Sequence, residues 1–340
     1  MDGQAKRRVG IAGATGAVGL EMLRVLEQRS FPTETVRVLA SDRAEERRLR
    51  FRQRDLIVEA LTPESLDGLD IVLFATSAEI SRRFVPEVVR RGGVAIDNSR
   101  EFRMVPVVPL VVPEINAHAL ATHQGIVANP NCSTIQMVQV LRPLAEQAGL
   151  KRVVAATYQS VSGTGLAAIE ELSEQSMAVL EENAASPHVY PKQIAFNCLP
   201  QIDVFDEFGD SREELKMVGE TRKILELPDL PVAVTCVRVP VFRSHAIAVN
   251  VETERQLSPD EARALLGNEP GVRVLDDPAE GVYPTQAETE RTDETWVGRI
   301  RRDGSVPHGI WLWVVSDNLR KGAALNAVQI AERLVDADAR

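Results

Sequence analysis

A glycine-rich turn near the start of the chain places the strongest constraint on the fold. The residues Gly13-Ala14-Thr15-Gly16-Ala17-Val18-Gly19 lie between an apolar run at Val9–Ala12 and a helical stretch at Leu20–Gln28. This G-x-x-G-x-x-G spacing is a variant of the dinucleotide-binding fingerprint, because glycine permits a tight turn and lets the backbone approach a pyrophosphate at the helix N-terminus. A glycine-rich turn alone is a weak signal, but the flanking strand and helix favour dinucleotide binding over a plain turn.

Short apolar runs alternate with helical stretches over the first 130 residues. Such alternation predicts βαβ units on a parallel sheet. We therefore expect an α/β fold in which residues 1–130 form a Rossmann-type, doubly wound domain, joined by a C-terminal helix within 319–340. The predicted strands are Val9–Ala12, Val36–Ala40, Ile71–Ala75, Val94–Ile96, Leu110–Val112 and Ile126–Ala128.

The pattern changes at about Lys151 to longer strand-like runs separated by helices. It predicts an α+β domain over residues 131–318, with a mixed or antiparallel sheet covered by helices on one face. A broad sheet of this kind is a common dimer surface, so we expect a homodimer. The predicted strands are Val153–Val161, Val232–Val239, Ala246–Val251, Trp296–Arg301 and Gly309–Ser316, and the predicted helices are Ala167–Glu182, Glu213–Leu225, Pro259–Leu266 and Leu325–Leu334.

Composition argues against several classes of protein. The 340 residues carry a formal net charge of −10, which disfavours a nucleic-acid surface. The cluster of arginines from Arg43 to Arg54 is interrupted by acidic residues and predicts a solvated edge or hairpin. No apolar run reaches the ~18–20 residues of a membrane span, and the polar N-terminus does not resemble a signal peptide.

The cysteines and histidines indicate a reducing compartment and no metal site. The three cysteines include no Cys-x-x-Cys pair, so we expect a cytoplasmic protein. The five histidines show no metal-ligand spacing with one another or with the cysteines, so no metal is expected.

Cys132 is the first candidate for a catalytic residue. It stands at the start of a predicted helix that Gly149 ends. The positive end of a helix dipole favours thiolate over thiol and lowers the pKa of a cysteine below its usual ~8.5. The alternative is a buried, inert cysteine, which composition alone would favour.

The second predicted strand ends at Ser41-Asp42-Arg43, where a doubly wound domain selects its cofactor. An acidic side chain there accepts hydrogen bonds from the ribose of NAD, whereas an arginine pairs with the 2′-phosphate of NADP. Arg43 favours NADP(H) and Asp42 opposes it, so some use of NADH is a second hypothesis.

Several motifs occur together and in order along the chain. On these motifs the chain resembles the aspartate-β-semialdehyde dehydrogenases over essentially its whole length. The resemblance implies reduction of L-aspartyl-4-phosphate by NADPH to the semialdehyde and phosphate through a covalent thioester, in the biosynthesis of lysine, threonine, methionine and isoleucine. The motifs are Gly13–Gly19, Asn98–Arg103, Asn129–Gln136, Tyr158–Gly163, Glu213–Met217, Arg238–His245 and Asp317–Ala324.

The resemblance implies four residues that act in the chemistry. Cys132 would attack the acyl phosphate, because thiolates are strong nucleophiles. His245 would act as acid and base with a pKa near ~6.5, although a core or capped histidine is the usual alternative. Gln159 and Asn131 would orient the substrate or the thioester by hydrogen bonding.

The resemblance also implies a substrate site of four charged residues. Arg238 would hold the α-carboxylate in a bidentate fork. Arg103 and Lys216 would bind the phosphate, and Glu213 would pair with the ammonium group. Glu213 and Lys216 share one helix face at i, i+3 spacing, which in most proteins means only a surface ion pair.

Three further positions match cofactor contacts of the family. These are Ser162, Gly163 and Asn318, although Asn318 could instead cap the helix that follows it. Two other functions compete with this interpretation. One is a related acyl-phosphate reductase, of the N-acetyl-γ-glutamyl-phosphate or glyceraldehyde-3-phosphate type. The other is a non-catalytic dinucleotide sensor, which would have no reason to combine Cys132 with His245.

Overall fold

The computed structural model describes residues 6–41 and 46–338. It divides into two compact units. One contains both ends of the chain, Met1–Asn131 and Ala323–Arg340, and we call it the terminal unit. The other, Cys132–Gly322, is the central unit.

A seven-stranded sheet forms the middle of the terminal unit in the described residues, in the order β3-β4-β2-β1-β5-β6-β7. All of its neighbouring strands pair in parallel except β3 and β4, which are antiparallel. The strands are β1 (Arg7–Ala12), β2 (Thr33–Ala40), β3 (Arg48–Phe51), β4 (Arg54–Ala60), β5 (Ile71–Phe74), β6 (Val94–Asp97) and β7 (Ile126–Ala128).

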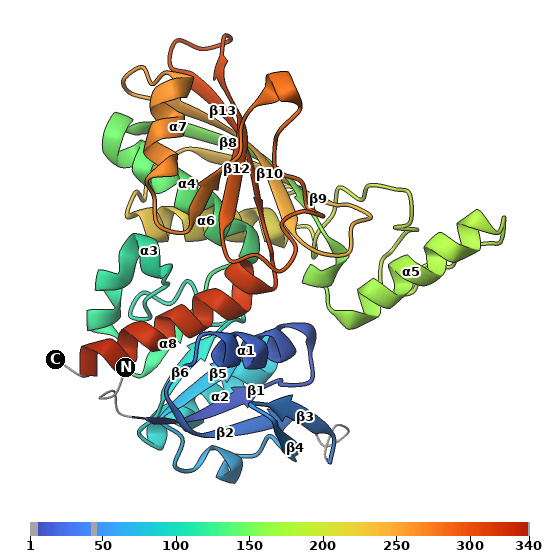
Figure 1. Ribbon diagram of the computed structural model, residues 1–340, viewed down its shortest axis with the longest axis vertical. Helices are drawn as coiled ribbons and strands as arrows, with labels where there is room; N and C mark the ends of the chain where they lie inside the picture. The colour runs from blue at the N-terminus through green and yellow to red at the C-terminus, as the bar shows by residue number, and fades with distance from the viewer. Residues whose placement is uncertain (1–5, 42–45, 339–340) are drawn as a thin grey trace. The chain divides into compact units, whose positions relative to one another are not determined.

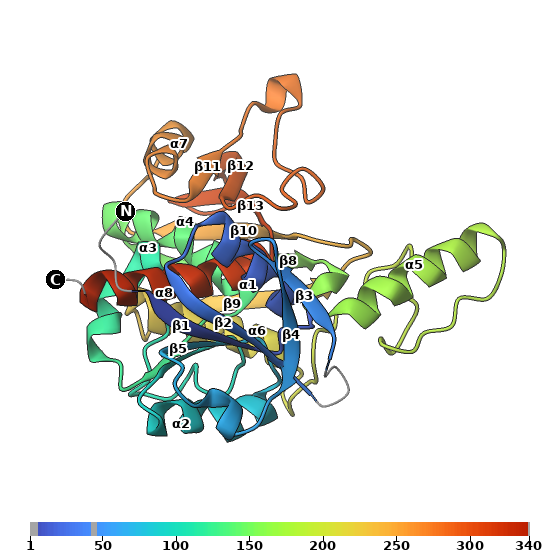
Figure 2. The same ribbon diagram turned by 60° about the horizontal axis from the view of Figure 1, so that its bottom comes forward.

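Helices cover both faces of this sheet. Figures 1 and 2 show α1 (Ala17–Gln28) and α8 (Leu325–Asp338) on one face and α2 (Ala78–Arg90) on the other. Each face has its own apolar core, one including Met22 of α1 and Val328 of α8, the other Phe84 of α2. The predicted doubly wound α/β fold is therefore confirmed, and α8 belongs to this unit. The short helix α3 (Pro113–Asn116) precedes β7.

The glycine turn joins β1 to α1 at the point where the strand order reverses. β2 and β5 lie on opposite sides of β1, and ligands of doubly wound sheets bind at such a switch point. Gly13 has φ of 82°, and a Cβ there would lie 2.3 Å from the Ala75 carbonyl oxygen. Only glycine fits, because both the backbone conformation and the neighbouring strand exclude a side chain.

Two predictions in this unit have different outcomes. The expected strand Leu110–Val112 is wrong, since it forms only a single bridge between Leu110 and Ala128. Pro109 and Pro113 flank it and lack the N–H groups that a central strand needs. The arginine-rich segment does form a hairpin, β3–β4, at the sheet edge. Asp42 and Arg43 lie outside the described residues.

The described part of the central unit contains a six-stranded mixed sheet in the order β11-β12-β13-β10-β8-β9. The prediction missed the three-residue strand β11 and placed the end of β8 too late, since Val161 begins a 3-10 turn. The strands are β8 (Leu150–Gln159), β9 (Val232–Arg238), β10 (His245–Thr253), β11 (Val272–Val274), β12 (Thr295–Asp303) and β13 (Gly309–Ser316).

Helices of the central unit pack on one face of its sheet, as predicted. α4 contacts β10 and β13, α6 contacts β9, and α7 contacts β12 (Figure 1). α5 extends away from the sheet in both ribbon views (Figures 1 and 2). No helix in the described ranges is long and apolar enough to cross a membrane. The helices are α4 (Cys132–Ala148), α5 (Leu166–Leu180), α6 (Arg212–Leu225) and α7 (Pro259–Gly267).

Two helices of this unit, α6 and α7, begin with a capping box. Ser211 precedes α6 and accepts a hydrogen bond from the Glu214 N–H, while the Glu214 carboxylate accepts one from the Ser211 N–H at 2.6 Å. Ser258 and Glu261 form an equivalent capping box before α7. Each box satisfies two backbone donors that the helix itself leaves without partners.

Replacing Ser211 by alanine is expected to lower the free energy of unfolding by about 1 kcal/mol, because a buried helix N–H loses its acceptor. Urea titration of the wild type, Ser211→Ala and Ser211→Thr measures this change. Threonine retains the hydroxyl and should lose much less stability than alanine. Equal stability of Ser211→Ala and wild type would show that the cap does not stabilise α6.

Candidate active site

Strand register brings three of the predicted site residues together. Gln159 at the end of β8 pairs with Arg238 at the end of β9 on one side and with His245 at the start of β10 on the other. Directly paired residues point to the same face of a sheet, and these three are at most 4% exposed. Their side chains therefore lie side by side on the buried face, where α4 and α6 also pack.

Hydrogen bonding fixes the tautomer of His245. The Ser160 N–H donates to Nδ1 at 3.0 Å, so Nδ1 carries the lone pair and Nε2 carries the hydrogen. Nε2 has no hydrogen-bond partner among the described residues, although the side chain is fully buried. A Cβ on Gly163 would lie 3.2 Å from Nε2. Glycine at position 163 therefore leaves space beside the Nε2 hydrogen.

The titration of His245 differs from the sequence prediction. Burial, and then the charge of Arg238, lower the pKa of His245 from 6.5 to about 3. The expectation of a pKa near ~6.5 is therefore wrong for this state of the protein. At neutral pH the imidazole is uncharged and is a hydrogen-bond donor at Nε2.

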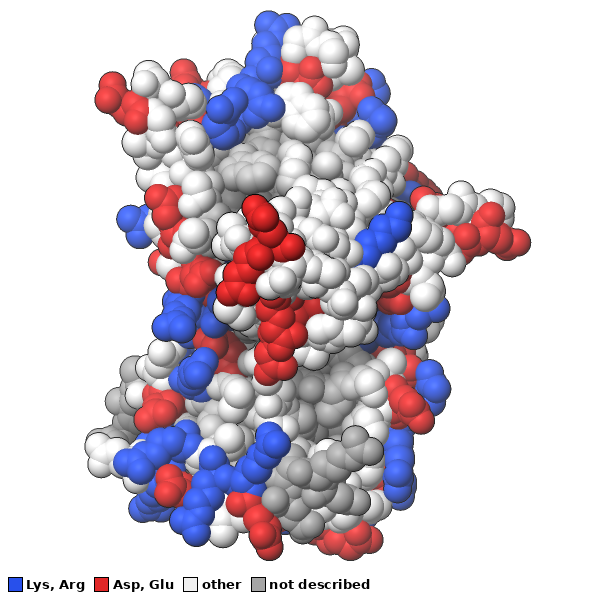
Figure 3. Space-filling model, turned by 90° about the vertical axis from the view of Figure 1, so that its right-hand side faces the viewer, with Lys and Arg blue, Asp and Glu red and all other residues white. Residues whose placement is uncertain are grey.

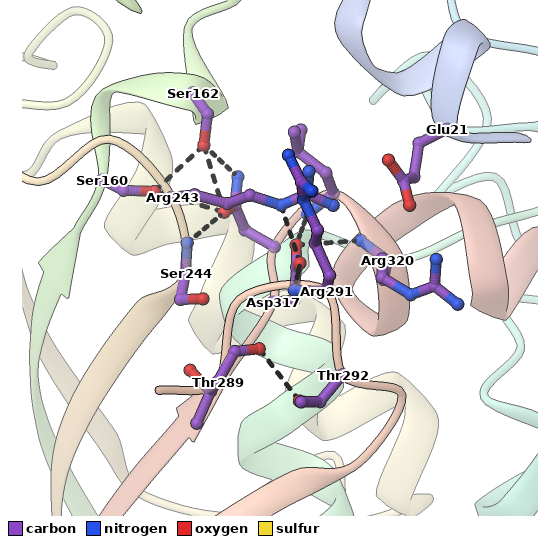
Figure 4. Close-up of polar contacts among 12 residues, drawn as sticks. Glu21, Ser160, Ser162, Arg243, Ser244, Thr289, Arg291, Thr292, Asp317 and Arg320 are labelled. Atoms are coloured by element: carbon purple, nitrogen blue, oxygen red, sulfur yellow. Dashed lines mark hydrogen bonds and ion pairs between the residues drawn. The ribbon is translucent and has the colours of Figure 1, made fainter. Parts of the chain in front are cut away.

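Asn318 positions the residue that precedes His245. Its Oδ1 accepts hydrogen bonds from the Ser244 N–H at 2.9 Å and from the hydroxyls of Ser160 and Ser162, which Figure 4 shows beside each other. Ser244 has a φ of 68°, a left-handed conformation that costs free energy in a non-glycine residue. The cap suggested for Asn318 is wrong, because Asp317 accepts from the Leu319 and Arg320 N–H groups instead.

Asp317 also holds the segments that contain Arg243 and Arg291. Its carboxylate pairs with Arg243 at 2.7 Å and accepts from the Arg291 N–H at 2.6 Å (Figure 4). Asp317 is fully buried, so these bonds compensate the loss of hydration of its charge. Asp317 and Arg243 stand within motifs of the sequence, but local patterns predicted no role for either residue.

Gln159, Glu213 and Lys216 form one chain of contacts. Gln159 Nε2 donates to Glu213 Oε1 at 3.1 Å, and Lys216 Nζ lies 3.0 Å from Glu213 Oε2 and 3.3 Å from an Asp203 oxygen. Glu213 is 5% exposed. The pair is thus more than a surface ion pair, because its carboxylate is buried and bonded to a neighbouring strand.

Arg238 is held rigidly within the central unit. Its Nη1 donates to the Ser160 carbonyl oxygen at 2.5 Å, and the Tyr190 ring centroid lies 6.0 Å from its Cζ. Nε is buried and has no partner among the described residues. A buried guanidinium with a remaining donor is suited to binding a carboxylate.

Cys132 is the first residue of α4, as predicted, and is partly buried. A Cβ on Gly322 would come within 2.9 Å of the Cys132 Cβ. Burial raises the pKa of the Cys236 thiol on β9, and the charges of Glu213, Glu214 and Cys132 add to the effect.

The predicted residues Arg103 and Asn131 belong to the terminal unit. Arg103 donates to the carbonyl oxygens of Asn129 and Asn98, at 3.0 and 2.6 Å. Asn129 is fully buried and bonded through its side chain to Asn98 and Asn326, at 2.8 and 2.7 Å. These bonds fix the segment that leads to Asn131. Sequence analysis gave Asn98 and Asn326 no role, because their partners lie far away in the chain.

The glycine turn suits the phosphates of a dinucleotide. Gly16 is the N-cap of α1, and within the described residues no side chain caps this helix. A Cβ on Gly16 would meet only the Gly13 carbonyl oxygen, at 3.5 Å. The free N–H groups and the open space together fit an anion such as a pyrophosphate. In the described ranges, no group of three or more His, Cys, Asp or Glu side chains could hold a metal ion.

Burial of neutral His245 should make stability depend on pH. The unfolded chain takes up a proton near pH 6.5 and the folded chain only near about 3, so the folded state loses stability as pH falls through that window. From about pH 7.5 to about pH 5 the wild type should lose ~2 kcal/mol more than His245→Asn in urea titrations. An equal loss in both proteins would contradict a depressed pKa.

Two family profiles match most of the chain. The profile described as "Semialdehyde dehydrogenase, NAD binding domain" matches residues 8–123, and "Semialdehyde dehydrogenase, dimerisation domain" matches residues 141–321. An aspartate-semialdehyde dehydrogenase of Aquifex aeolicus is 50% identical over 332 residues, covering 96% of this chain and 98% of that protein. One of Bacillus subtilis is 46% identical over 334 residues, covering 96% of each.

Solved structures give the same result. The crystal structure of aspartate semialdehyde dehydrogenase II complexed with ASA, from Vibrio cholerae, is 44% identical with a TM-score of 0.95. It covers 98% of this chain, and this chain covers 99% of it. Similarity therefore extends through both units. The chain belongs to the aspartate-semialdehyde dehydrogenase family.

Proposed function

We propose that the chain reduces L-aspartyl-4-phosphate with NADPH to L-aspartate 4-semialdehyde and phosphate, through a thioester on Cys132. The observation that carries this proposal is the register that places Gln159, Arg238 and His245 side by side on one buried face. The reaction is a step in the biosynthesis of lysine, threonine, methionine and isoleucine, in keeping with the family.

The charges of the central unit match a zwitterionic substrate. Arg238 would bind the α-carboxylate, using donors that the Ser160 carbonyl oxygen does not engage. Glu213 would pair with the ammonium group, and Lys216 would bind the phosphate, as would Arg103. A carboxylate and an ammonium group one helical turn apart can address the two ends of one small molecule.

The chemistry needs a nucleophile and a donor to the developing oxyanion. The Cys132 thiolate would attack the acyl carbon, and phosphate would leave with the electron pair of the broken C–O bond. The thioester carbonyl would then become an oxyanion when hydride adds to its carbon, and collapse of that oxyanion releases the aldehyde and regenerates the thiolate.

Neutral His245 suits these steps as a donor. Its Nε2 hydrogen would bond to the oxyanion and share the proton as the intermediate forms and collapses. Gln159 and Asn131 would orient the acyl group. Both side chains are uncharged amides, so neither forms an ion pair with the Cys132 thiolate that would weaken it as a nucleophile.

The cofactor would bind to the glycine turn and to the residues of the central unit that match cofactor contacts of the family. The glycine turn Gly13–Gly19 would hold the pyrophosphate at the start of α1. Ser162, Gly163 and Asn318 would contact the cofactor in the central unit, and Arg43 would pair with the 2′-phosphate of NADP(H). When bound, the nicotinamide supplies the hydride for the thioester carbon.

A homodimer through the sheet of the central unit is also proposed. Tyr158 and Trp313 lie on the face opposite the helices, with their ring centroids 5.3 Å apart, and Tyr158 is 38% exposed. Figure 3 shows large uncharged areas in the part of the molecule that contains this unit. The match to a dimerisation-domain profile supports the proposal.

Turnover in the phosphorolytic direction tests the function. Purified protein given L-aspartate semialdehyde, phosphate and NADP should reduce the cofactor, with a higher kcat/KM than for NAD. Cys132→Ser should lose more than about 10³-fold in kcat, because a hydroxyl is a much weaker nucleophile at neutral pH. Cys198→Ser, at an exposed cysteine, is the matched control and should retain wild-type activity.

Activity that survives in Cys132→Ser would exclude the thioester. Cofactor binding without turnover in the wild type would instead favour the sensor hypothesis.

Gly163 gives a separate test of the space beside His245. A methyl group in Gly163→Ala would lie 3.1 Å from Arg238 Nη1 and 3.2 Å from His245 Nε2. We expect kcat/KM to fall by about tenfold, because Arg238 and His245 must shift to accept the methyl group and a misplacement of ~1 Å at reacting groups costs about 10²-fold. Gly304→Ala, where a Cβ meets nothing within 4 Å, should be unchanged. Wild-type kcat/KM in Gly163→Ala would refute the assignment.

A further inference from the structure

The Thr157 side chain hydrogen-bonds to the Gln159 side chain on the same strand, β8. The two residues are separated by one position on β8, so their side chains lie on the same face. Thr157 Oγ1 is 3.0 Å from Gln159 Oε1, and neither residue is more than 1% exposed. Nothing in the family comparison or in the sequence motifs gives Thr157 a role.

The neighbouring strand favours Thr157 as the donor in this hydrogen bond. The Val237 N–H on β9 lies 3.3 Å from Thr157 Oγ1, and a backbone N–H can only donate. The hydroxyl therefore accepts from Val237 and has its own hydrogen available for Gln159 Oε1. Thr157 thus presents a donor to the carboxamide.

At the nitrogen end of the Gln159 carboxamide, Glu213 requires a donor. Its Oε1 accepts from Gln159 Nε2 at 3.1 Å, and its Oε2 faces Lys216 Nζ at 3.0 Å. An ionised carboxylate only accepts hydrogen bonds. If the Gln159 amide turned over, its oxygen would face the Glu213 oxygen with no hydrogen between them, and it would lose the hydrogen bond that the Thr157 hydroxyl donates.

The remaining neighbour of Thr157, Cys236, also hydrogen-bonds with this hydroxyl but is a weaker partner than Gln159. Cys236 pairs with Thr157 across β8 and β9, and burial raises the pKa of its thiol. It stays uncharged, and a thiol is a weak hydrogen-bond group. The strong partners of the Thr157 hydroxyl are therefore Val237 and Gln159.

We propose that Thr157 is a positioning residue that holds the Gln159 carboxamide in one orientation. In that orientation Glu213 uses one N–H of Nε2, and the second N–H is available to the acyl group on Cys132. This inference rests on the proposed role of Gln159 in orienting the substrate. Without the hydroxyl, the carboxamide loses the donor at its oxygen and populates orientations that present no N–H to the acyl group.

Serine and alanine at position 157 differ by a single oxygen atom and form the matched pair for a test. Thr157→Ala should lower kcat about tenfold, the effect of one lost neutral hydrogen bond, with a smaller change in KM. Thr157→Ser keeps the donor and should restore most of the rate. Thr157→Val, which keeps the shape of threonine, should resemble alanine. Urea titration of each variant shows whether it is folded under the assay conditions.

A double-mutant cycle with Gln159→Ala separates positioning from a general structural effect. If Thr157 acts through Gln159, removing the hydroxyl should not slow the Gln159→Ala enzyme further. Additive losses in the double variant, or equal kcat in Thr157→Ser and Thr157→Ala, would overturn the proposal. A Gln159→Ala enzyme as fast as wild type would overturn it as well. Failure of the proposed function itself is distinct, because the wild type would then show no turnover at all.

Discussion

The register of β9, β8 and β10 is the constraint on which the rest of the site depends. Side chains alternate along a strand, so a slip of any one of these strands by one residue would turn its own member of the group, Arg238, Gln159 or His245, to the opposite face. Apolar residues on the same face of β8 and β10, such as Val153 and Val249, are completely buried. Packing of this apolar stripe under α4 therefore selects the register that also brings the polar ends together.

Burial then determines what the polar groups do. His245 is uncharged because water is excluded and Arg238 is close, and Ser160 determines which ring nitrogen holds the hydrogen. The strained Ser244 is held by Asn318, so the conformation of the turn before His245 depends on a bond from a residue 74 positions away. The site thus combines a neutral donor with a fixed direction, which a histidine in water would not provide.

Local patterns predicted most of the fold, and each failure has a physical cause. The glycine turn, the hairpin at Arg48–Ala60 and the start of α4 follow from neighbouring residues. Leu110–Val112 was wrong because flanking prolines remove backbone donors, and β11 was too short to show periodicity. The bond between Asn129 and Asn326 spans 197 positions, and no local pattern in the sequence predicts it. The low pKa of His245 was missed because burial at the strand end comes from tertiary packing.

The hydrogen bonds around Gln159 show why buried polar side chains can be stable beside an apolar core. A buried polar group without a partner costs several times what a satisfied one contributes, so each member of the network constrains the next. Val237, Thr157, Gln159, Glu213 and Lys216 alternate donor and acceptor without a mismatch. A reversed carboxamide would place its oxygen against a Glu213 oxygen and would lose the hydrogen bond that Thr157 donates. Glu213, which can only accept, therefore sets the orientation of the carboxamide, and the Thr157 hydroxyl supports that orientation from the other end.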